Sequence, residues 1–265
     1  MNPEQQSGAG HQSGFVPLNG MNMYYEIHGT GRPLVLVHGG GSTLDTTFGR
    51  VIPFFAAGHQ VIVPELQAHG HTPDRDTPLT FSQDADDVAG MLRFLGIDNA
   101  DVLGFSNGGT TALQLAIRHP GMVGKLVVAS AFSKRSGAQP FLWEFLHKAT
   151  YADMPVQLKD AFLAIDPDES HLIRMHDRDL FRMQNFPDIP DEDLRGIRAE
   201  TLILTGDRDV LTPEHAVELS RLIPDARLMI LPGGHGEYLG EVTTLQDGRL
   251  SYVYAAGLIE DFLKK

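Results

Sequence analysis

The sequence predicts an α/β protein: a mostly parallel, doubly wound sheet with helices on both faces and an inserted helical lid. Short apolar runs alternate with segments of helical periodicity from about residue 15 onward. Runs that are apolar throughout are typical of parallel strands buried on both faces. The alternation stops between about residues 133 and 198, where no strand-like run occurs. We therefore expect a helical insertion, after which the chain returns to the same sheet.

The expected elements follow one another along the chain. Residues 21–29, MNMYYEIHG, alternate and predict an early antiparallel strand. Buried strands are expected at 33–37, 59–65, 99–106, 124–132, 199–207 and 226–234. Helices are expected at 46–58, 81–96, 107–121 and 212–224. Ser82 is expected to cap the second of these helices and Thr212 the fourth, where Pro213 takes the first helical position.

This order divides the chain into a core, a lid and a tail. Residues 15–132 and 199–265 are predicted to form the α/β core, and residues 133–198 a helical lid of three or four helices. The lid segment contains the single tryptophan, Trp143. Residues 1–14 are small and polar, so we expect a disordered tail there.

Composition excludes several classes of function. The formal charge of -13 disfavours binding to nucleic acid or to anionic membrane surfaces. The absence of cysteine excludes disulfides, thiol catalysis and cysteine-based zinc sites. No apolar run approaches the length of a membrane span, and the N-terminus lacks the features of a signal peptide. We expect a cytoplasmic protein with a small-molecule substrate, and the sequence leaves monomer and homodimer open.

The stretch GFSNGG, residues 104–109, places Ser106 between a predicted strand and a predicted helix. A serine on such a sharp turn is exposed at the carboxyl edge of a parallel sheet, where ligands bind. Gly104 and Gly108 let the backbone pass closely on both sides. The N–H of Asn107 then lies at a helix N-terminus, where it can stabilise an oxyanion. A plain strand-to-helix turn with an incidental serine is the alternative.

Three further stretches lie at strand ends and favour the catalytic interpretation. His38 is followed by three glycines after the strand PLVLV, and Gly40 is the expected second oxyanion donor. Asp207 and Asp209 follow the strand TLILT, and Asp209 is the preferred acid. His235 follows the last strand in a glycine-rich turn. The order serine, aspartate, histidine is that of a nucleophile, its orienting acid and its base on successive strands.

Together these motifs resemble the α/β-hydrolase fold family in its form with a helical lid. The resemblance rests on His38-Gly39, GFSNGG, the G-x-x-D-x-x-x-P stretch from Gly206 to Pro213, and Gly234-His235. It implies that Ser106 is the nucleophile, His235 the general base and acid, and Asp209 the orienting acid. Serine at position 106 argues against epoxide hydrolases and haloalkane dehalogenases, which use aspartate there. Expected pocket residues are His38, Gly39, Phe105, Phe132 and Trp143.

The chain departs from the family pattern after the strand that ends near Pro64. The stretch PELQAHGHT stands where Asp-x-x-Gly-x-Gly is common, and the segment after His235 is longer than usual. His69 and His71 suggest a metal, but Pro73 stands where the metallohydrolase pattern needs aspartate, so a solvated loop is preferred. We expect neither a metal nor a cofactor.

The expected reaction is hydrolysis of a small-to-medium ester, lactone or thioester through an acyl-enzyme. Carbon–carbon bond hydrolysis and perhydrolysis remain alternatives, because the fold does not decide the substrate. A small-molecule receptor with slow turnover is a third. The aromatic and methionine content of the lid suggests an apolar substrate group, although these residues can equally form the lid's own core.

Overall fold

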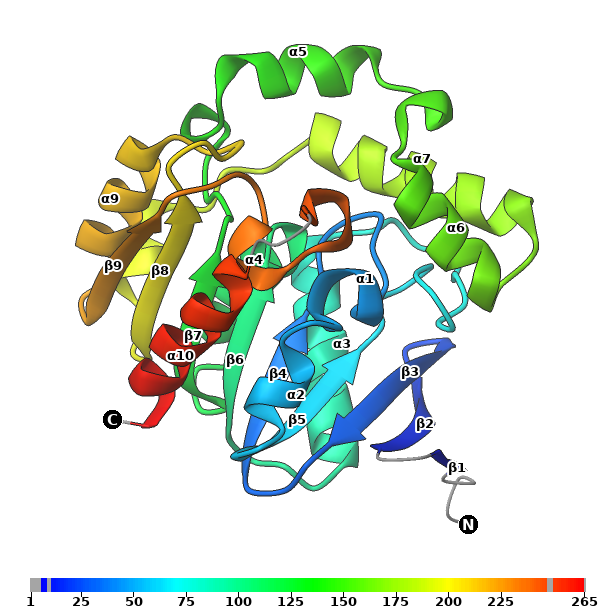
Figure 1. Cartoon of the computed structure of the whole chain (residues 1–265), viewed down its shortest axis with the longest axis horizontal. Helices are drawn as coiled ribbons and strands as arrows, with labels where there is room; N and C mark the ends of the chain where they lie inside the picture. The colour runs from blue at the N-terminus through cyan, green and yellow to red at the C-terminus, as the bar shows by residue number, and fades with distance from the viewer. Residues whose placement is uncertain (1–5, 9–10, 247–249, 265) are drawn as a thin grey trace.

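A computed structural model describes residues 6–8, 11–246 and 250–264. Within these residues one nine-stranded sheet forms the centre, in the order β1-β2-β3-β5-β4-β6-β7-β8-β9 (Figure 1). β3 pairs antiparallel with β2 and β5, whereas the pairs from β5 through β4 to β9 are all parallel. The strands are β1 Gln6–Gly8, β2 His11–Leu18, β3 Met21–His28, β4 Arg32–Val37, β5 His59–Pro64, β6 Ala100–Phe105, β7 Val123–Ala129, β8 Glu200–Gly206 and β9 Ala226–Leu231.

Helices cover both faces of this sheet, as its apolar strands require. Along β4, Val35 and Val37 belong to one core cluster and Leu34 and Leu36 to the other, because successive side chains point to opposite faces. The first face is covered by α3 Phe81–Phe94, α4 Asn107–Arg118 and α9 Pro213–Leu222. The second is covered by α1 Leu44–Phe48, α2 Ile52–Phe55 and α10 Ser251–Lys264 (Figure 1). The doubly wound α/β fold is therefore confirmed.

The segment from 133 to 198 contains helices and, in this fully described range, no strand. Its α-helices are α5 Pro140–Lys148, α6 Val156–Ile165, α7 Glu169–Gln184 and α8 Asp191–Arg195, with short 3-10 turns at Arg135–Gly137 and Tyr151–Asp153. In Figure 1, α5, α6 and α7 arch over the top of the sheet. A separate apolar cluster joins α6 and α7 to the loop after β5, through Met154, Phe162, Met175 and Ala68.

The N-terminus corrects one expectation. Residues 6–8 form β1, and residues 11–14 begin β2, so the expected disordered tail is wrong for these residues. β2 pairs with β3 along its whole length, from His11↔His28 to Leu18↔Met21. Its small and polar side chains suit a strand near the sheet edge with much of its surface exposed. Residues 1–5 and 9–10 of the predicted tail lie outside the described residues.

The caps of two helices test the local sequence rules. Thr212 accepts a hydrogen bond from the His215 N–H and caps α9, as predicted. α3 begins two residues earlier than a cap at Ser82 would allow, and Thr80 is its cap instead of Ser82. Thr80 is the cap because its extended backbone lets its hydroxyl accept the Gln83 N–H.

No helix in the described part of the chain combines the length and the apolar character that a membrane span requires.

Candidate active site

Ser106 stands on the sharp turn between β6 and α4, in a backbone conformation that non-glycine residues rarely adopt. Its φ is 54° and its ψ is -122°. Such strain persists only where close packing imposes it. A Cβ atom on Gly108 would lie 2.1 Å from the Val37 carbonyl oxygen, and one on Gly104 would lie 2.1 Å from the Gly108 carbonyl oxygen. The glycines of GFSNGG thus allow the approach of strand and helix that holds the serine in place.

Ser106, His235 and Asp209 are brought together at the carboxyl edge of the sheet. His235 Nε2 lies 3.0 Å from Ser106 Oγ, and His235 Nδ1 lies 2.7 Å from Asp209 Oδ1. β6 positions the serine, the loop after β8 the aspartate, and the glycine-rich loop after β9 the histidine. Residues far apart in sequence therefore form one continuous hydrogen-bonded chain. This is the geometry in which a histidine can take a proton from a serine while a carboxylate orients the ring.

The Asp209 carboxylate is buried, and hydrogen-bond donors of the protein surround it. Its oxygens accept hydrogen bonds from the Val210 N–H at 2.7 Å and the Gly206 N–H at 3.2 Å. The hydroxyls of Thr205 and Ser130 also donate to it. Burial alone would raise the pKa of Asp209, but the His235 imidazole and these hydrogen bonds outweigh burial and lower the pKa to about 2. Asp209 is therefore an anion at neutral pH.

The ring of His235 is partly exposed and packs against Phe105, with ring centroids 4.7 Å apart. Burial alone would lower the pKa of His235, but the Asp209 carboxylate outweighs burial and raises it above the ordinary value for histidine. A raised pKa makes the imidazole a stronger base, at the cost of being protonated over a wider range of acidic pH.

Asp207, the competing acid, takes a different role. Its Oδ1 accepts a hydrogen bond from the Gly233 N–H at 2.8 Å, in the loop that carries His235. This hydrogen bond joins the loops after β8 and β9, and Asp209 is the aspartate that contacts the imidazole.

Gly40 and Asn107, the expected oxyanion donors, both line the cavity beside Ser106. In the described part of the chain, neither backbone N–H has a protein acceptor. The N–H of the neighbouring Gly41 donates a hydrogen bond to Asp179 Oδ2 at 2.6 Å. A side chain at position 40 is excluded, because its Cβ would lie 2.3 Å from Asn107 Nδ2 and 3.0 Å from Asp179 Oδ2.

A cavity of about 340 Å³ opens over Ser106 and His235, within the usual size range of small-ligand sites. Most of its lining comes from the segment between 133 and 198. The apolar part of that lining consists of Leu142, Phe145, Leu146, Ala149, Met154, Pro155, Leu158, Leu180 and Met183. Asp153 and Asp179 also line it, and no lysine or arginine is among the described lining residues. The wall is thus largely apolar, with acidic groups and no fixed cation.

Of the five expected pocket residues, Phe132 lines the cavity and four do not, within the described chain. His38 is fully buried behind the wall, where its Nε2 accepts from the Leu66 N–H. Phe105 lies beneath His235, and Gly39 packs on Phe105 and Ser106. Trp143 packs on Phe132 and Phe186 and donates to the Arg135 carbonyl. These four support the site from behind, so their assignment to the pocket is corrected.

The stretch PELQAHGHT is not the solvated loop that we expected, because Glu65, Gln67 and His69 are buried. His69 Nε2 lies 2.9 Å from Asp179 Oδ2, and His71 Nδ1 lies 2.8 Å from Glu65 Oε2. Asp179 also pairs with Arg182, which pairs with Asp84 of α3 at 2.6 Å. Sequence reasoning missed Asp179. An aspartate three residues before an arginine on a helix is usually a surface pair, so local pattern offered no signal.

Comparison with known proteins agrees with this architecture. Residues 34–241 match the model of the alpha/beta hydrolase family. The chain is 26% identical over 245 residues to the human serine hydrolase BPHL, covering 88% of this chain and 82% of that protein. It is 28% identical over 261 residues to 2-hydroxy-6-oxo-6-phenylhexa-2,4-dienoate hydrolase of Burkholderia cepacia, covering 83% of this chain and 88% of that one.

A solved enol-lactonase from Burkholderia xenovorans LB400 superposes with a TM-score of 0.74 and 20% identity, over 95% of this chain and all of that one. Identity at that level supports the fold alone. The family match, in contrast, spans most of the sequence, from β4 to the loop that follows His235. This chain belongs to the alpha/beta hydrolase family.

Proposed function

We propose that this protein is a serine hydrolase that cleaves a small-to-medium, uncharged carboxylic ester, lactone or thioester through an acyl-enzyme. The observation that carries the proposal is the chain Ser106–His235–Asp209, with both hydrogen-bond separations at or below 3.0 Å. A serine hydroxyl is a weak nucleophile unless a base accepts its proton, and this arrangement supplies that base.

In the proposed mechanism, Ser106 Oγ attacks the substrate carbonyl carbon while its proton passes to His235 Nε2. Asp209 holds the Nδ1–H tautomer and stabilises the imidazolium. The tetrahedral oxyanion accepts hydrogen bonds from the N–H groups of Gly40 and Asn107, each of which contributes about 3–4 kcal/mol in comparable sites. His235 then protonates the leaving alcohol or thiol. A water molecule, deprotonated by the same ring, releases the acid and restores Ser106.

The cavity wall supports an uncharged, apolar substrate. Its volume of about 340 Å³ suits a small-to-medium molecule, and its lid-derived side chains are mostly apolar. A substrate carboxylate would find Asp153 and Asp179 and no lysine or arginine among the described lining residues. Asp179 is already paired with Arg182 and His69, so Asp153 is the acidic group that would repel such an anion. The carbon–carbon bond hydrolases among the relatives act, by their names, on dienoate anions. We therefore favour esters and lactones over that alternative.

A panel of p-nitrophenyl esters of increasing chain length tests the proposal. Lactones and a 2-hydroxy-6-oxo-dienoate are then tried as further substrates. We expect steady turnover that is fastest for a short or medium acyl group. A single burst without further turnover would instead indicate the receptor alternative. Turnover of the dienoate alone would indicate carbon–carbon bond hydrolysis, and acceleration by peroxide would indicate perhydrolysis.

A further inference from the structure

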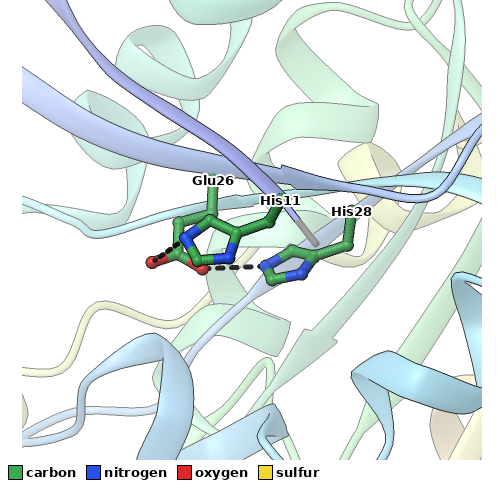
Figure 2. A group of neighbouring side chains, drawn as sticks. All are labelled: His11, Glu26 and His28. Carbon is green, nitrogen blue, oxygen red and sulfur yellow. Dashed lines mark hydrogen bonds and ion pairs between the residues drawn. The ribbon is translucent and has the colours of Figure 1, made fainter. Parts of the chain in front are cut away.

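A compact group of His11, Glu26 and His28 lies on one face of the β2–β3 hairpin (Figure 2). His11 and His28 are directly paired across the two strands, and Glu26 lies two residues before His28 on the same face. The imidazole rings are stacked with centroids 4.8 Å apart. The Nε2 atoms of both rings approach the same carboxylate, at 3.6 Å for His11 and 2.8 Å for His28.

We propose that these three side chains bind a divalent transition metal of the zinc class. Imidazole nitrogen and carboxylate oxygen are ligands that zinc prefers, and two histidines with one carboxylate form a recognised ligand set. With bonds of about 2.05 Å, tetrahedral zinc holds its ligand atoms about 3.3 Å apart. The donor atoms here all lie within 4.8 Å of one another, so small side-chain rotations bring them to that spacing.

The surroundings favour a cation and allow its entry. The side chains of His11 and Glu26 are 31% and 13% exposed, so an ion can enter from solvent. Burial raises the pKa of Asp45, and the charges of Glu26 and Glu65 raise it further while His28 and His11 oppose them, so two more carboxylates, Asp45 and Glu65, lie in the surroundings of the group. The Tyr24 hydroxyl donates to Glu26 Oε1 at 2.8 Å and orients the carboxylate, as supporting residues do in metal sites. A bound ion would tie β2 to β3.

Isothermal titration calorimetry with Zn²⁺ on tag-free, EDTA-treated protein tests this site. We expect one saturable site per chain and a rise in melting temperature with Zn²⁺. His28→Ala and the isosteric Glu26→Gln should each weaken binding at least tenfold. His171→Ala is the matched control, because His171 also lies beside two carboxylates, Asp166 and Asp168.

The control variant should bind Zn²⁺ as tightly as wild type. Circular dichroism of each variant separates loss of the site from loss of the fold. Absence of a saturable site, or equal affinity in His28→Ala and wild type, would overturn the proposal.

A second inference comes from the Asp179 carboxylate and rests on the proposed function. Asp179 belongs to α7 of the lid, yet its Oδ2 accepts the Gly41 N–H at 2.6 Å. The same oxygen lies against Gly40, since a Cβ on that residue would be 3.0 Å from it. The backbone that presents the Gly40 N–H is thus held by a side chain from the lid.

Asp179 is itself held from two sides, by the loop after β5 and by Arg182 of its own helix. His69, in the loop after β5, contacts Oδ2, and Arg182 contacts Oδ1 while reaching Asp84 of α3. All four side chains are buried. Burial alone would raise the pKa of Asp179, but Arg182 and His69 outweigh it and hold that pKa well below its ordinary value. Breaking such a buried network is costly, so the carboxylate has one strongly preferred place.

We infer that Asp179 is a positioning residue that sets the oxyanion loop, residues 38–43, and makes catalysis depend on the place of lid helix α7. Asp179→Ala removes the acceptor of the Gly41 N–H. Asp84→Ala is the matched control, because it also removes one carboxylate from Arg182 but leaves the Gly41 contact. Both variants should lose stability. Asp179→Ala alone should lower kcat at least tenfold with KM changed less than threefold, and Asp179→Asn, which keeps an oxygen acceptor, should recover part of kcat.

Hydrogen–deuterium exchange of the peptide that contains residues 38–43 provides a readout that does not need activity. Exchange should accelerate in Asp179→Ala and stay near wild type in Asp84→Ala. Equal losses of kcat in both alanine variants, or unchanged exchange in Asp179→Ala, would overturn this inference. If the wild-type protein turned over no ester, the proposed function would fail, whereas the exchange result would still judge the role of Asp179 in the loop.

Discussion

Replacing Asp209 by asparagine probes the proposed division of labour between two neighbouring aspartates. The Asp209 carboxylate lies 2.7 Å from His235 Nδ1 and, in the proposed mechanism, holds the proton on that nitrogen. An asparagine in its place would turn its NH₂ group toward Nδ1, because its oxygen is retained by the Gly206 and Thr205 donors. The ring would then carry its proton on Nε2, and that nitrogen could not accept the Ser106 proton.

The expected loss in kcat is about 10⁴-fold, or about 5.5 kcal/mol of transition-state stabilisation. Stability should also fall. The pKa of Asp209, about 2 against an ordinary 3.8, corresponds to about 2 kcal/mol of folded-state preference for the anion. Because this pKa is lowered by folding, that stabilisation is present above about pH 4 and disappears as the pH falls toward 2. The asparagine variant should lack this acid-dependent part of the unfolding free energy.

Asp207→Asn is the control, since an amide oxygen can still accept the Gly233 N–H that Asp207 Oδ1 accepts at 2.8 Å. We expect near-normal kcat and a stability loss of about 1 kcal/mol or less. Steady-state kinetics on a p-nitrophenyl ester and thermal melting of both variants provide the comparison. An inactive Asp207→Asn enzyme beside an active Asp209→Asn enzyme would refute the reasoning.

Three further predictions concern the pH profile, the pocket and the glycines of the turn at Ser106. The value of kcat/KM should rise with pH through the pKa of His235, which Asp209 raises, because only the neutral ring is a base; a flat profile between pH 5 and 8 would contradict this. Phe145→Ala, in the cavity wall, should raise the preference for longer over shorter acyl chains about tenfold. Phe141→Ala, an exposed change on the same helix outside the wall, should not. Gly108→Ala should destabilise the protein by about 3 kcal/mol through its clash with the Val37 carbonyl. Gly257→Ala, where a Cβ meets nothing within 4 Å, should stabilise α10 by up to about 1 kcal/mol. Equal melting temperatures for these two glycine variants would count against the packing argument.

The parts of the fold that local chemistry dictates could be predicted from sequence. Uniformly apolar strands such as PLVLV and the glycines around Ser106 have one common structural explanation, a covered parallel sheet with a tight turn at its edge. The order of Ser106, Asp209 and His235 then places all three at that edge. β2 was not predicted because a strand next to the sheet edge can be polar, and pairing with β3 rather than its own composition makes it a strand.

The pocket was harder to predict because it is made by tertiary packing of the helices between residues 133 and 198. Trp143 and Phe105 are large aromatics close to the site in sequence terms, yet they pack behind the wall, whereas Phe145 and Leu146 form it. Helical periodicity does not tell which side of a lid helix faces a cavity and which faces the core. The link from Asp179 to Gly41 spans 138 residues and has no local signature.

The most direct test of the central claim is intact-protein mass spectrometry of the acyl-enzyme. Wild-type protein quenched during turnover of a slowly deacylating p-nitrophenyl ester should gain the mass of one acyl group, and peptide mapping should place it on Ser106. Ser106→Ala should fold and melt like wild type, gain no mass and lose turnover by several orders of magnitude. An acyl group on another residue, or retained turnover in Ser106→Ala, would contradict the account.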